Sequence, residues 1–229
     1  MKSLLNDFMN FFIYWKEIWR GKDVYRTMMN ASCQDFQLHG HVLDLGSGNN
    51  LASYHRFFQK DASVQIDFLD LQPVSHKERA ATFDFEKDLL PYETAAVDQI
   101  LMFNLLEHLY NYNHLLQEVV RTLKKDGQIF GSVPFLVGYH PDPHDYFRYT
   151  SEALRKIFVE NGLLEPQIRI LGNGPFIAAF SQLEFIMPRV IKMFLCPLAY
   201  LLDSFLFRVR PALLKEKFAL GLFFVATKL

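Results

Sequence analysis

Short apolar runs alternate with helical stretches from residue 41 onward, and this alternation constrains the fold more than any other feature. Strands followed by helices predict a parallel sheet with helices on both faces. The expected strands are residues 41–45, 64–69, 81–85, 98–103, 128–133, 166–171 and 218–229, and the expected helices lie near 50–60, 112–124 and 150–161. We therefore predict an α/β fold with a doubly wound, mostly parallel, seven-stranded sheet.

Length and charge narrow the class of protein. The chain has 229 residues, enough for one domain with a substantial core. Its net charge is -1, which argues against an electrostatic grip on nucleic acid. The two cysteines, Cys33 and Cys196, are far apart, so neither a disulfide framework nor a thiolate zinc site is expected, and a cytoplasmic location fits.

The first twenty residues are rich in aromatic and aliphatic side chains. Asp7 and Asn10 interrupt the apolar run, and no small-residue cleavage site follows, so this is not a signal peptide. The pattern instead predicts an amphipathic helix with one broad apolar face. Such a helix packs on the domain, covers the substrate as a lid, or faces a membrane.

Residues 175–215 form a second apolar region. We expect Pro188, Pro197 and Pro211 to break it into amphipathic helices. Its longest uncharged run, 193–202, has ten residues, against roughly twenty for a bilayer span, so a transmembrane helix is not expected. These helices either pack on the domain, pair with a second subunit or lie in a membrane interface.

The sharpest motif is VLDLGSG at 42–48, where the first strand ends. Gly46 and Gly48 allow a tight turn and close approach of a ligand to the backbone. Asp70 ends the second strand, 22 residues after Gly48, where an acid can hold ribose hydroxyls. Asp44 before the glycines, and Leu51 at the position of a third glycine, disfavour a dinucleotide site.

With these motifs the sequence resembles class I S-adenosylmethionine-dependent methyltransferases, in the branch called methyltransferase type 11. VLDLGSG, FLDLQP, TFDFEKDLLPY, VDQILMFNLLEHL and LLQEVVRTLKKDGQIFGSVPF occur in that order. The resemblance implies a Rossmann-like methyltransferase fold that binds S-adenosyl-L-methionine, with Asn50 altering the glycine turn. The implied cofactor-binding residues are Asp44, Gly46, Ser47, Gly48, Asp70, Leu71, Asp84, Phe85, Phe103, Asn104 and His108. His108 also fits a structural histidine, Asp84 a turn cap and Glu107 a helix cap.

The segment HPDPHDYFRYT at 140–150 follows the fifth strand and falls beside the same crevice. A metal site of His140, Asp142 and His144 is the lesser reading, because two prolines bend the chain and no further ligands follow, so no metal is assigned. A rigid turn is the other alternative, and Thr150 is expected to cap the next helix. Similar segments occur on the acceptor side of related methyltransferases. We assign His140, His144 and Asp145 to catalysis and Tyr139, Tyr146, Arg148 and Tyr149 to substrate binding.

The expected organisation is a single methyltransferase domain. It has an N-terminal helical lid (1–39), a cofactor-binding core (40–172), an apolar helical insertion (173–217) and a terminal strand (218–229). The expected activity is methyl transfer to an oxygen or nitrogen of a small molecule or of a lipid- or glycan-linked acceptor. The alternatives are a non-catalytic S-adenosylmethionine-binding or membrane-scaffolding module and an NAD-dependent dehydrogenase. No nucleic-acid partner is expected, whereas 175–215 provides for peripheral membrane contact or a homodimer.

Overall fold

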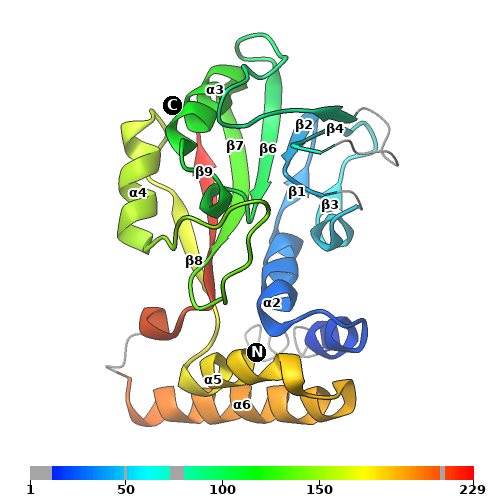
Figure 1. Cartoon of the computed structure of the whole chain (residues 1–229), viewed down its shortest axis with the longest axis vertical. Helices are drawn as coiled ribbons and strands as arrows, with labels where there is room; N and C mark the ends of the chain where they lie inside the picture. The colour runs from blue at the N-terminus through cyan, green and yellow to red at the C-terminus, as the bar shows by residue number, and fades with distance from the viewer. Residues whose placement is uncertain (1–11, 49–50, 73–79, 212–214) are drawn as a thin grey trace. The chain divides into compact units, whose positions relative to one another are not determined.

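The computed structural model describes residues 12–48, 51–72, 80–211 and 215–229 (Figure 1). Asn50 lies outside these residues. The strands are β1 (Gln37–Leu38), β2 (His41–Leu45), β3 (Gln59–Lys60), β4 (Gln65–Asp70), β5 (Ala80–Thr82), β6 (Val97–Phe103), β7 (Leu123–Pro134), β8 (Gln167–Leu171) and β9 (Gly221–Thr227). The helices are α2 (Val24–Ser32), α3 (Tyr112–Thr122), α4 (Ser151–Glu160), α5 (Pro175–Leu183) and α6 (Arg189–Val209). Short 3-10 helices are η1 (Cys33–Asp35), η2 (Ser53–Arg56), η3 (Leu106–His108), η4 (Glu184–Ile186) and η5 (Lys215–Phe218).

Seven strands form the main sheet in the order β5-β4-β2-β6-β7-β9-β8, and β1 pairs with β3 in a separate ribbon. The pairs β2–β4, β4–β5, β2–β6 and β6–β7 are parallel. The predicted α/β fold is confirmed. The chain builds outward from β2 to β5 and then returns to the other side of β2 with β6, so the strand order reverses between β2 and β6. Such a switch point opens a crevice at the carboxyl ends of the strands.

The central strands are apolar because the sheet buries them on both faces. β2 has four fully buried residues and β6 six. Aromatic rings from different strands meet here: Phe103 of β6 lies 6.0 Å from Phe223 of β9, and Phe58 lies 5.7 Å from Phe130 of β7. This packing makes the sheet a rigid base for the loops at its carboxyl edge.

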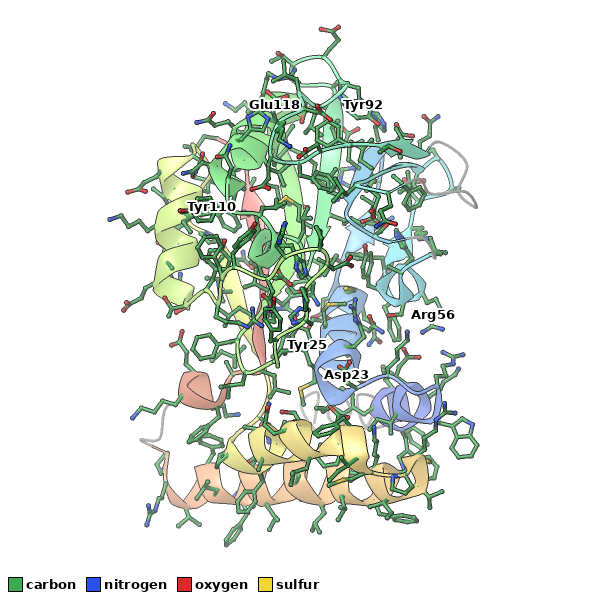
Figure 2. All side chains as sticks on the ribbon, viewed as in Figure 1. Asp23, Tyr25, Arg56, Tyr92, Tyr110 and Glu118 are labelled. Carbon is green, nitrogen blue, oxygen red and sulfur yellow. The ribbon has the colours of Figure 1, made fainter. Side chains whose placement is uncertain are left out.

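Helix α3 holds residues 90–92, which follow the strand end at β5, in place. The Glu118 carboxylate accepts a hydrogen bond from the Leu90 backbone N–H at 2.8 Å, and Arg121 donates to the carbonyls of Leu90 and Tyr92. Figure 2 labels Glu118 and Tyr92 at this end of the fold. Leu90 to Tyr92 are therefore held against α3, a few residues after Asp84.

Three predicted boundaries are wrong. The helix expected near 50–60 is only the 3-10 helix η2, because the chain then turns to pair β3 with β1. The strand expected at 81–85 stops at Thr82, since Asp84 begins a turn by accepting the backbone N–H of Glu86. The helix expected near 112–124 ends at Thr122, and the strand expected at 128–133 already begins at Leu123 as β7.

The chain divides into two compact units. Unit 1 comprises Met1–Cys33, Phe135–Gly138 and Ile170–Gly221, and unit 2 comprises Gln34–Pro134, Tyr139–Arg169 and Leu222–Leu229. Unit 2 contains β1 to β7 with α3 and α4, and unit 1 contains α2, α5 and α6. The assignment of residues 1–39 as a lid stays a prediction.

Two buried acids cap the amino ends of helices inside unit 1. Asp203 of α6 accepts hydrogen bonds from the backbone N–H groups of Phe176 and Ile177, both at 2.9 Å, at the amino end of α5. The Glu184 carboxylate accepts from the first N–H of α2, at Val24, at 3.0 Å. Both acids therefore satisfy helix N–H groups that have no partner within their helix. Figure 1 shows α5 lying along α6.

Helix α6 contradicts one prediction from the sequence. Pro188 and Pro211 do bound it, but Pro197 lies inside a continuous 21-residue helix. A proline at position 197 cannot donate to the carbonyl of Met193, four residues earlier. The indole N–H of Trp15 donates to that carbonyl instead, at 3.1 Å. A residue far away in the sequence thus replaces the bond that the proline removes.

The continuity of α6 also changes the membrane argument. By length and composition, α6 is long and apolar enough to cross a bilayer, with a mean hydropathy of 1.7, and no other helix among the described residues meets that test. Only 11% of its apolar 18-residue stretch is buried, so α6 is not an ordinary core helix. The expectation of no transmembrane helix was based on the ten-residue uncharged run 193–202, and α6 extends beyond that run at both ends.

Candidate functional site

A pocket opens in unit 2 at the carboxyl ends of β2, β4 and β6. It encloses about 730 Å³, counting the space open to solvent, which suits a small organic ligand. The lining residues come from the strand ends and from the loop after β7: Gly46, Gly48, Asp70, Leu71, Gln72, Asp84, Phe85, Glu86, Asn104, Leu105, His108, Leu109, Asp142, Pro143 and His144. The pocket therefore lies at the switch point of the sheet, where ligands of such folds bind.

The glycine turn after β2 forms one wall. Gly46 and Gly48 have φ angles of 70° and 73°, a left-handed conformation that side chains with a Cβ disfavour. A Cβ at Gly46 would lie 2.8 Å from the Leu105 side chain, whereas a Cβ at Gly48 would enter open space. The Gly48 N–H donates to the Asp70 carboxylate at 2.8 Å. The turn is thus held by a hydrogen bond to the acid that ends β4, and its open side faces the pocket.

Two acids line the pocket on separate loops, as the sequence predicted for their strand ends. Asp70 lies at the end of β4, and Asp84 lies beyond β5 beside the buried Phe85 ring. Hydrogen bonds from the Lys87 ammonium and from the Glu86 backbone N–H lower the pKa of Asp84. Asp84 is therefore an anion at neutral pH.

The end of β6 supplies the far wall. Asn104 lines the pocket with a positive φ of 52°, and its side-chain oxygen accepts a hydrogen bond from Ser132 of β7 at 2.8 Å. The strain of this backbone conformation is held by pairing with β7, because the Asn104 N–H also donates to the Ser132 carbonyl. His108 of η3 lines the pocket as well.

Three residues predicted to bind cofactor lie outside the lining. Asp44 is fully buried and accepts hydrogen bonds from the Tyr54 hydroxyl at 2.7 Å and from His55 Nε2 at 2.6 Å. Phe103 is buried and stacks on Tyr54, with ring centroids 4.2 Å apart. Ser47 does not line the pocket either. This buried network holds Asp44 in β2, just before the glycine turn, and away from the pocket.

The loop 139–150 divides between pocket and scaffold. Asp142, Pro143 and His144 line the pocket, whereas His140 and Asp145 do not. Asp145 accepts two hydrogen bonds from the Arg148 guanidinium and one from the His140 backbone N–H. The guanidinium holds the pKa of Asp145 well below its usual range. This anion fixes the shape of the loop.

The residues predicted to bind substrate do not gather at the pocket. Arg148 is engaged by Asp145, and Tyr149 is buried, with its hydroxyl donating to the Leu106 carbonyl at 3.1 Å. Tyr139 is 78% exposed, and Tyr146 is exposed with its ring 5.2 Å from that of His144. None of the four lines the pocket. Their roles in substrate binding stay predictions.

The predicted cap at the end of this loop is confirmed. The Thr150 hydroxyl accepts the Ala153 N–H at 3.1 Å, at the amino end of α4. The loop therefore ends in a fixed position where the helix begins.

Sequence reasoning underrated Glu107, which lies at the centre of a polar cluster. Its carboxylate is fully buried, and neither oxygen has a hydrogen-bond donor among the described residues. Glu107 Oε1 lies 3.7 Å from His108 Nε2 and 3.8 Å from His140 Nε2. The spacing of these residues along the chain offers no signal for this convergence, since His140 arrives from another loop.

Comparison with known families decides the class of domain. Residues 43–131 match the family model described as a methyltransferase domain. This segment is similar to methyltransferase domains. The matched range runs from β2 to β7. It contains the glycine turn, both acids and Asn104, and only the loop after β7 contributes to the pocket from outside it. The resemblance seen in the sequence is confirmed.

Solved structures share the fold of the methyltransferase domain at low identity. A chain from the Haloferax volcanii complex between the Trm112 methyltransferase activator and a methyltransferase is 16% identical, with a TM-score of 0.56, covering 89% of this chain and 88% of that one. The [4+2]-cyclase SpnF is 16% identical, with a TM-score of 0.54, covering 89% and 80%. Phosphoethanolamine N-methyltransferase 2 of Haemonchus contortus, in complex with S-adenosyl-L-methionine, is 15% identical, with a TM-score of 0.54, covering 89% and 52%. No curated protein matches the sequence.

Proposed function

We propose that the protein binds S-adenosyl-L-methionine in the pocket of unit 2 and transfers its methyl group to an oxygen or nitrogen atom of an acceptor. The observation that carries this proposal is the pocket itself. It lies mostly in the segment that matches the methyltransferase-domain model, and it joins a left-handed glycine turn to two acids that follow separate strands. A nucleoside with an amino-acid tail needs such an arrangement, with backbone groups for one end and carboxylates for the other.

The residues of the pocket fit this cofactor. Gly46 and Gly48 leave space where a Cβ would clash or project, so they would hold the methionine end. Asp70 would accept the ribose hydroxyls, and Asp84 with Phe85 would receive the adenine. When bound, the sulfonium supplies an activated methyl group, and the chain needs only to orient the acceptor in line with it.

His144 is the best placed group to take a proton from the acceptor. Its exposed imidazole lines the pocket, next to the Tyr146 ring. His140, by contrast, turns toward Glu107 and Asp145. The acceptor that we propose is a small molecule or the polar head of a lipid- or glycan-linked one, because the exposed Tyr146 ring, next to the pocket residue His144, offers apolar contact beside polar groups.

Calorimetric titration of the full chain with S-adenosylmethionine and S-adenosylhomocysteine tests the cofactor assignment. Asp70→Asn removes the charge at the proposed ribose contact and is expected to weaken binding by about 10- to 100-fold, the loss of one or two hydrogen bonds to a charged group. Asp61→Asn is the matched control, since Asp61 is an exposed acid near the opposite end of β4. Equal affinities of both variants and the wild type would refute the site.

Methyl transfer needs its own measurement, because a cyclase shares this fold. The full chain is incubated with cell extract and methyl-labelled cofactor, and labelled products are followed by mass spectrometry. His144→Ala is expected to lower turnover by about 10²- to 10⁴-fold while cofactor affinity stays unchanged. Turnover that survives this substitution would exclude His144 as the base, and absence of any labelled product would favour a non-catalytic cofactor-binding protein.

A further inference from the structure

We infer that Glu107, His108 and His140 form a binding site for one divalent transition-metal ion of the zinc class. Their ligand atoms all lie within 4.8 Å of one another, and the resemblance to methyltransferases does not imply this role for them. The three residues come from η3 and from the loop after β7, and all belong to unit 2. One carboxylate and two imidazoles are a ligand set that zinc and its neighbours accept.

The hydrogen bond at His108 Nδ1 carries the argument. His108 Nδ1 lies at hydrogen-bond distance from the His144 carbonyl oxygen, which can only accept, so Nδ1 bears the proton. Nε2 is then the ring nitrogen left for a ligand, and that atom faces the buried Glu107 carboxylate at 3.7 Å. A cation between the imidazole nitrogen and the carboxylate would satisfy the buried oxygens of Glu107, which have no hydrogen-bond donor among the described residues.

His140 completes the set. Its Nε2 lies 3.8 Å from the same Glu107 oxygen, and its Nδ1 lies 3.6 Å from Asp145, which is paired with Arg148. Ligands of a tetrahedral zinc ion lie about 3.4 Å apart, so small side-chain movements bring the three atoms into place. A carbonyl behind one imidazole and a carboxylate behind the other are the outer partners that orient metal-binding histidines.

The position of the cluster assigns the ion a role. Three protein ligands leave a fourth position open, as in catalytic zinc sites. His108 lines the pocket, so an ion bound to it would be next to the ligand space. There the ion would bind and polarise an oxygen of the acceptor, and this role, unlike metal binding itself, rests on the proposed methyl transfer.

Equilibrium dialysis of the full chain against Zn²⁺, with metal measured by atomic emission, tests the site. We expect one ion per chain, with affinity falling at least about a hundredfold in Glu107→Gln and in His140→Ala. His144→Ala is the matched control, because it removes a neighbouring pocket histidine that is outside the set. Co²⁺ in place of Zn²⁺ should give visible absorption bands that the first two variants lose and the control keeps.

Four results overturn the site. Sub-stoichiometric metal in the wild type would mean that the three side chains do not hold an ion. Loss of metal in His144→Ala with retention in Glu107→Gln would place the ion on the 140–144 loop. Unchanged affinity in all variants would place the ion elsewhere. If circular dichroism shows that Glu107→Gln and His140→Ala are unfolded, His108→Ala decides, and a folded His108→Ala variant that binds metal normally would refute the site. Cofactor titration runs in parallel, so a failure of cofactor binding with intact metal binding is distinguishable.

A different observation, in unit 1, carries a second inference. The side of α6 away from α5 is covered by large exposed apolar side chains, which Figure 2 shows projecting outward. Phe194 is 69% exposed, Leu201 64% and Phe205 67%. The other exposed members are Val190, Ile191, Leu195, Leu198, Leu202 and Val209. We propose that this α6 face binds the surface of an anionic lipid membrane.

Charge selects a membrane over a second copy of the chain. Unit 1 has eleven basic and six acidic residues, a net charge of +5, whereas the whole chain carries -1 and unit 2 therefore -6. Three of the acids, Glu17, Glu184 and Asp203, are buried, so the surface of unit 1 is more cationic than its net charge. Anionic headgroups attract such a surface, and a second α6 face would bring the same charge sign against it.

The helix lies in the membrane plane. Its buried stripe of Cys196, Ala199 and Asp203 faces the interior of unit 1, and Asp203 holds the amino end of α5. Crossing the bilayer would carry that carboxylate into hydrocarbon. Arg189 and Arg208, exposed near the two ends of the helix, can instead reach the headgroups beside an apolar face that enters the interface.

Flotation of the full chain with phosphatidylcholine vesicles, with and without phosphatidylglycerol, tests this surface. We expect co-flotation with the anionic vesicles that weakens with salt, and a partition coefficient about tenfold lower for each of Leu201→Gln and Phe205→Gln. Arg208→Gln should lower it about fivefold. Leu89→Gln is the control, because Leu89 is 69% exposed but lies in unit 2. A stable dimer in sedimentation, broken by the same α6 variants, or no flotation at all, would overturn the proposal.

Discussion

Burial of Glu184 makes the stability of unit 1 fall as pH rises. Burial raises the pKa of Glu184 to about 7, and the neighbouring Asp23 carboxylate adds to that rise, while the Val24 N–H and Lys192 oppose it. The ordinary pKa of this carboxyl is 4.5, so the folded state binds its proton more tightly than the unfolded state does. Stability is then complete below about pH 4.5 and is lost as pH rises through about 7.

The size of the effect follows from the two pKa values. A difference between 4.5 and about 7 corresponds to about 3 kcal/mol of unfolding free energy, lost between those pH values. Glu184→Gln keeps an oxygen that can accept the Val24 N–H at the start of α2 but cannot ionise. We therefore expect this variant to match the wild type at about pH 4 and to exceed it by about 3 kcal/mol at about pH 8.

Urea unfolding followed by tryptophan fluorescence measures this change in unit 1 alone, because both tryptophans of the chain, Trp15 and Trp19, belong to it. Glu160→Gln is the matched control, since Glu160 is an exposed acid of α4 in unit 2. The reasoning is refuted if the difference between Glu184→Gln and the wild type stays constant across the pH range. A Glu160→Gln curve that departs from the wild type with pH would equally show that the effect is not specific to burial.

Two further predictions concern hydrogen bonds at helix positions. Trp15→Phe removes the donor to the Met193 carbonyl and should lower the free energy of unfolding by about 1 kcal/mol, measured by urea unfolding with circular dichroism. The loss should be much smaller in a Pro197→Ala background, where the backbone N–H is restored. Equal losses in both backgrounds would contradict this account. Thr150→Ala removes the cap of α4 and should cost about 1 kcal/mol, whereas Thr150→Ser should be nearly neutral, and a serine variant as unstable as the alanine variant would argue against capping.

The strands and the pocket's strand ends were predictable because their signals are local. Apolar runs bounded by polar residues mark β2, β4 and β6, and the glycines after β2 with Asp70 after β4 follow directly from the places where those strands stop. Parallel strands bring their carboxyl ends to one edge, so a motif after each strand becomes part of one pocket. No contact between distant residues has to be guessed.

Asp44 shows where that local logic stops. Its motif suggested direct cofactor contact, yet Tyr54 and His55 hold it in a buried network. Glu107 is the opposite case, since only the fold reveals that His140 comes within 3.8 Å of it. Which way a side chain faces, and which loop arrives beside it, depends on tertiary packing that the sequence pattern does not encode.

Pro197 shows how one such contact alters a larger conclusion. A proline in an apolar stretch predicts a break, because it removes a backbone hydrogen bond inside the helix. The break fails to occur here since the orphaned Met193 carbonyl finds the Trp15 indole, 178 residues earlier in the chain. The helix therefore runs for 21 residues instead of two short pieces. Its exposed apolar face is thereby continuous, and a continuous face is what binding to a membrane surface requires.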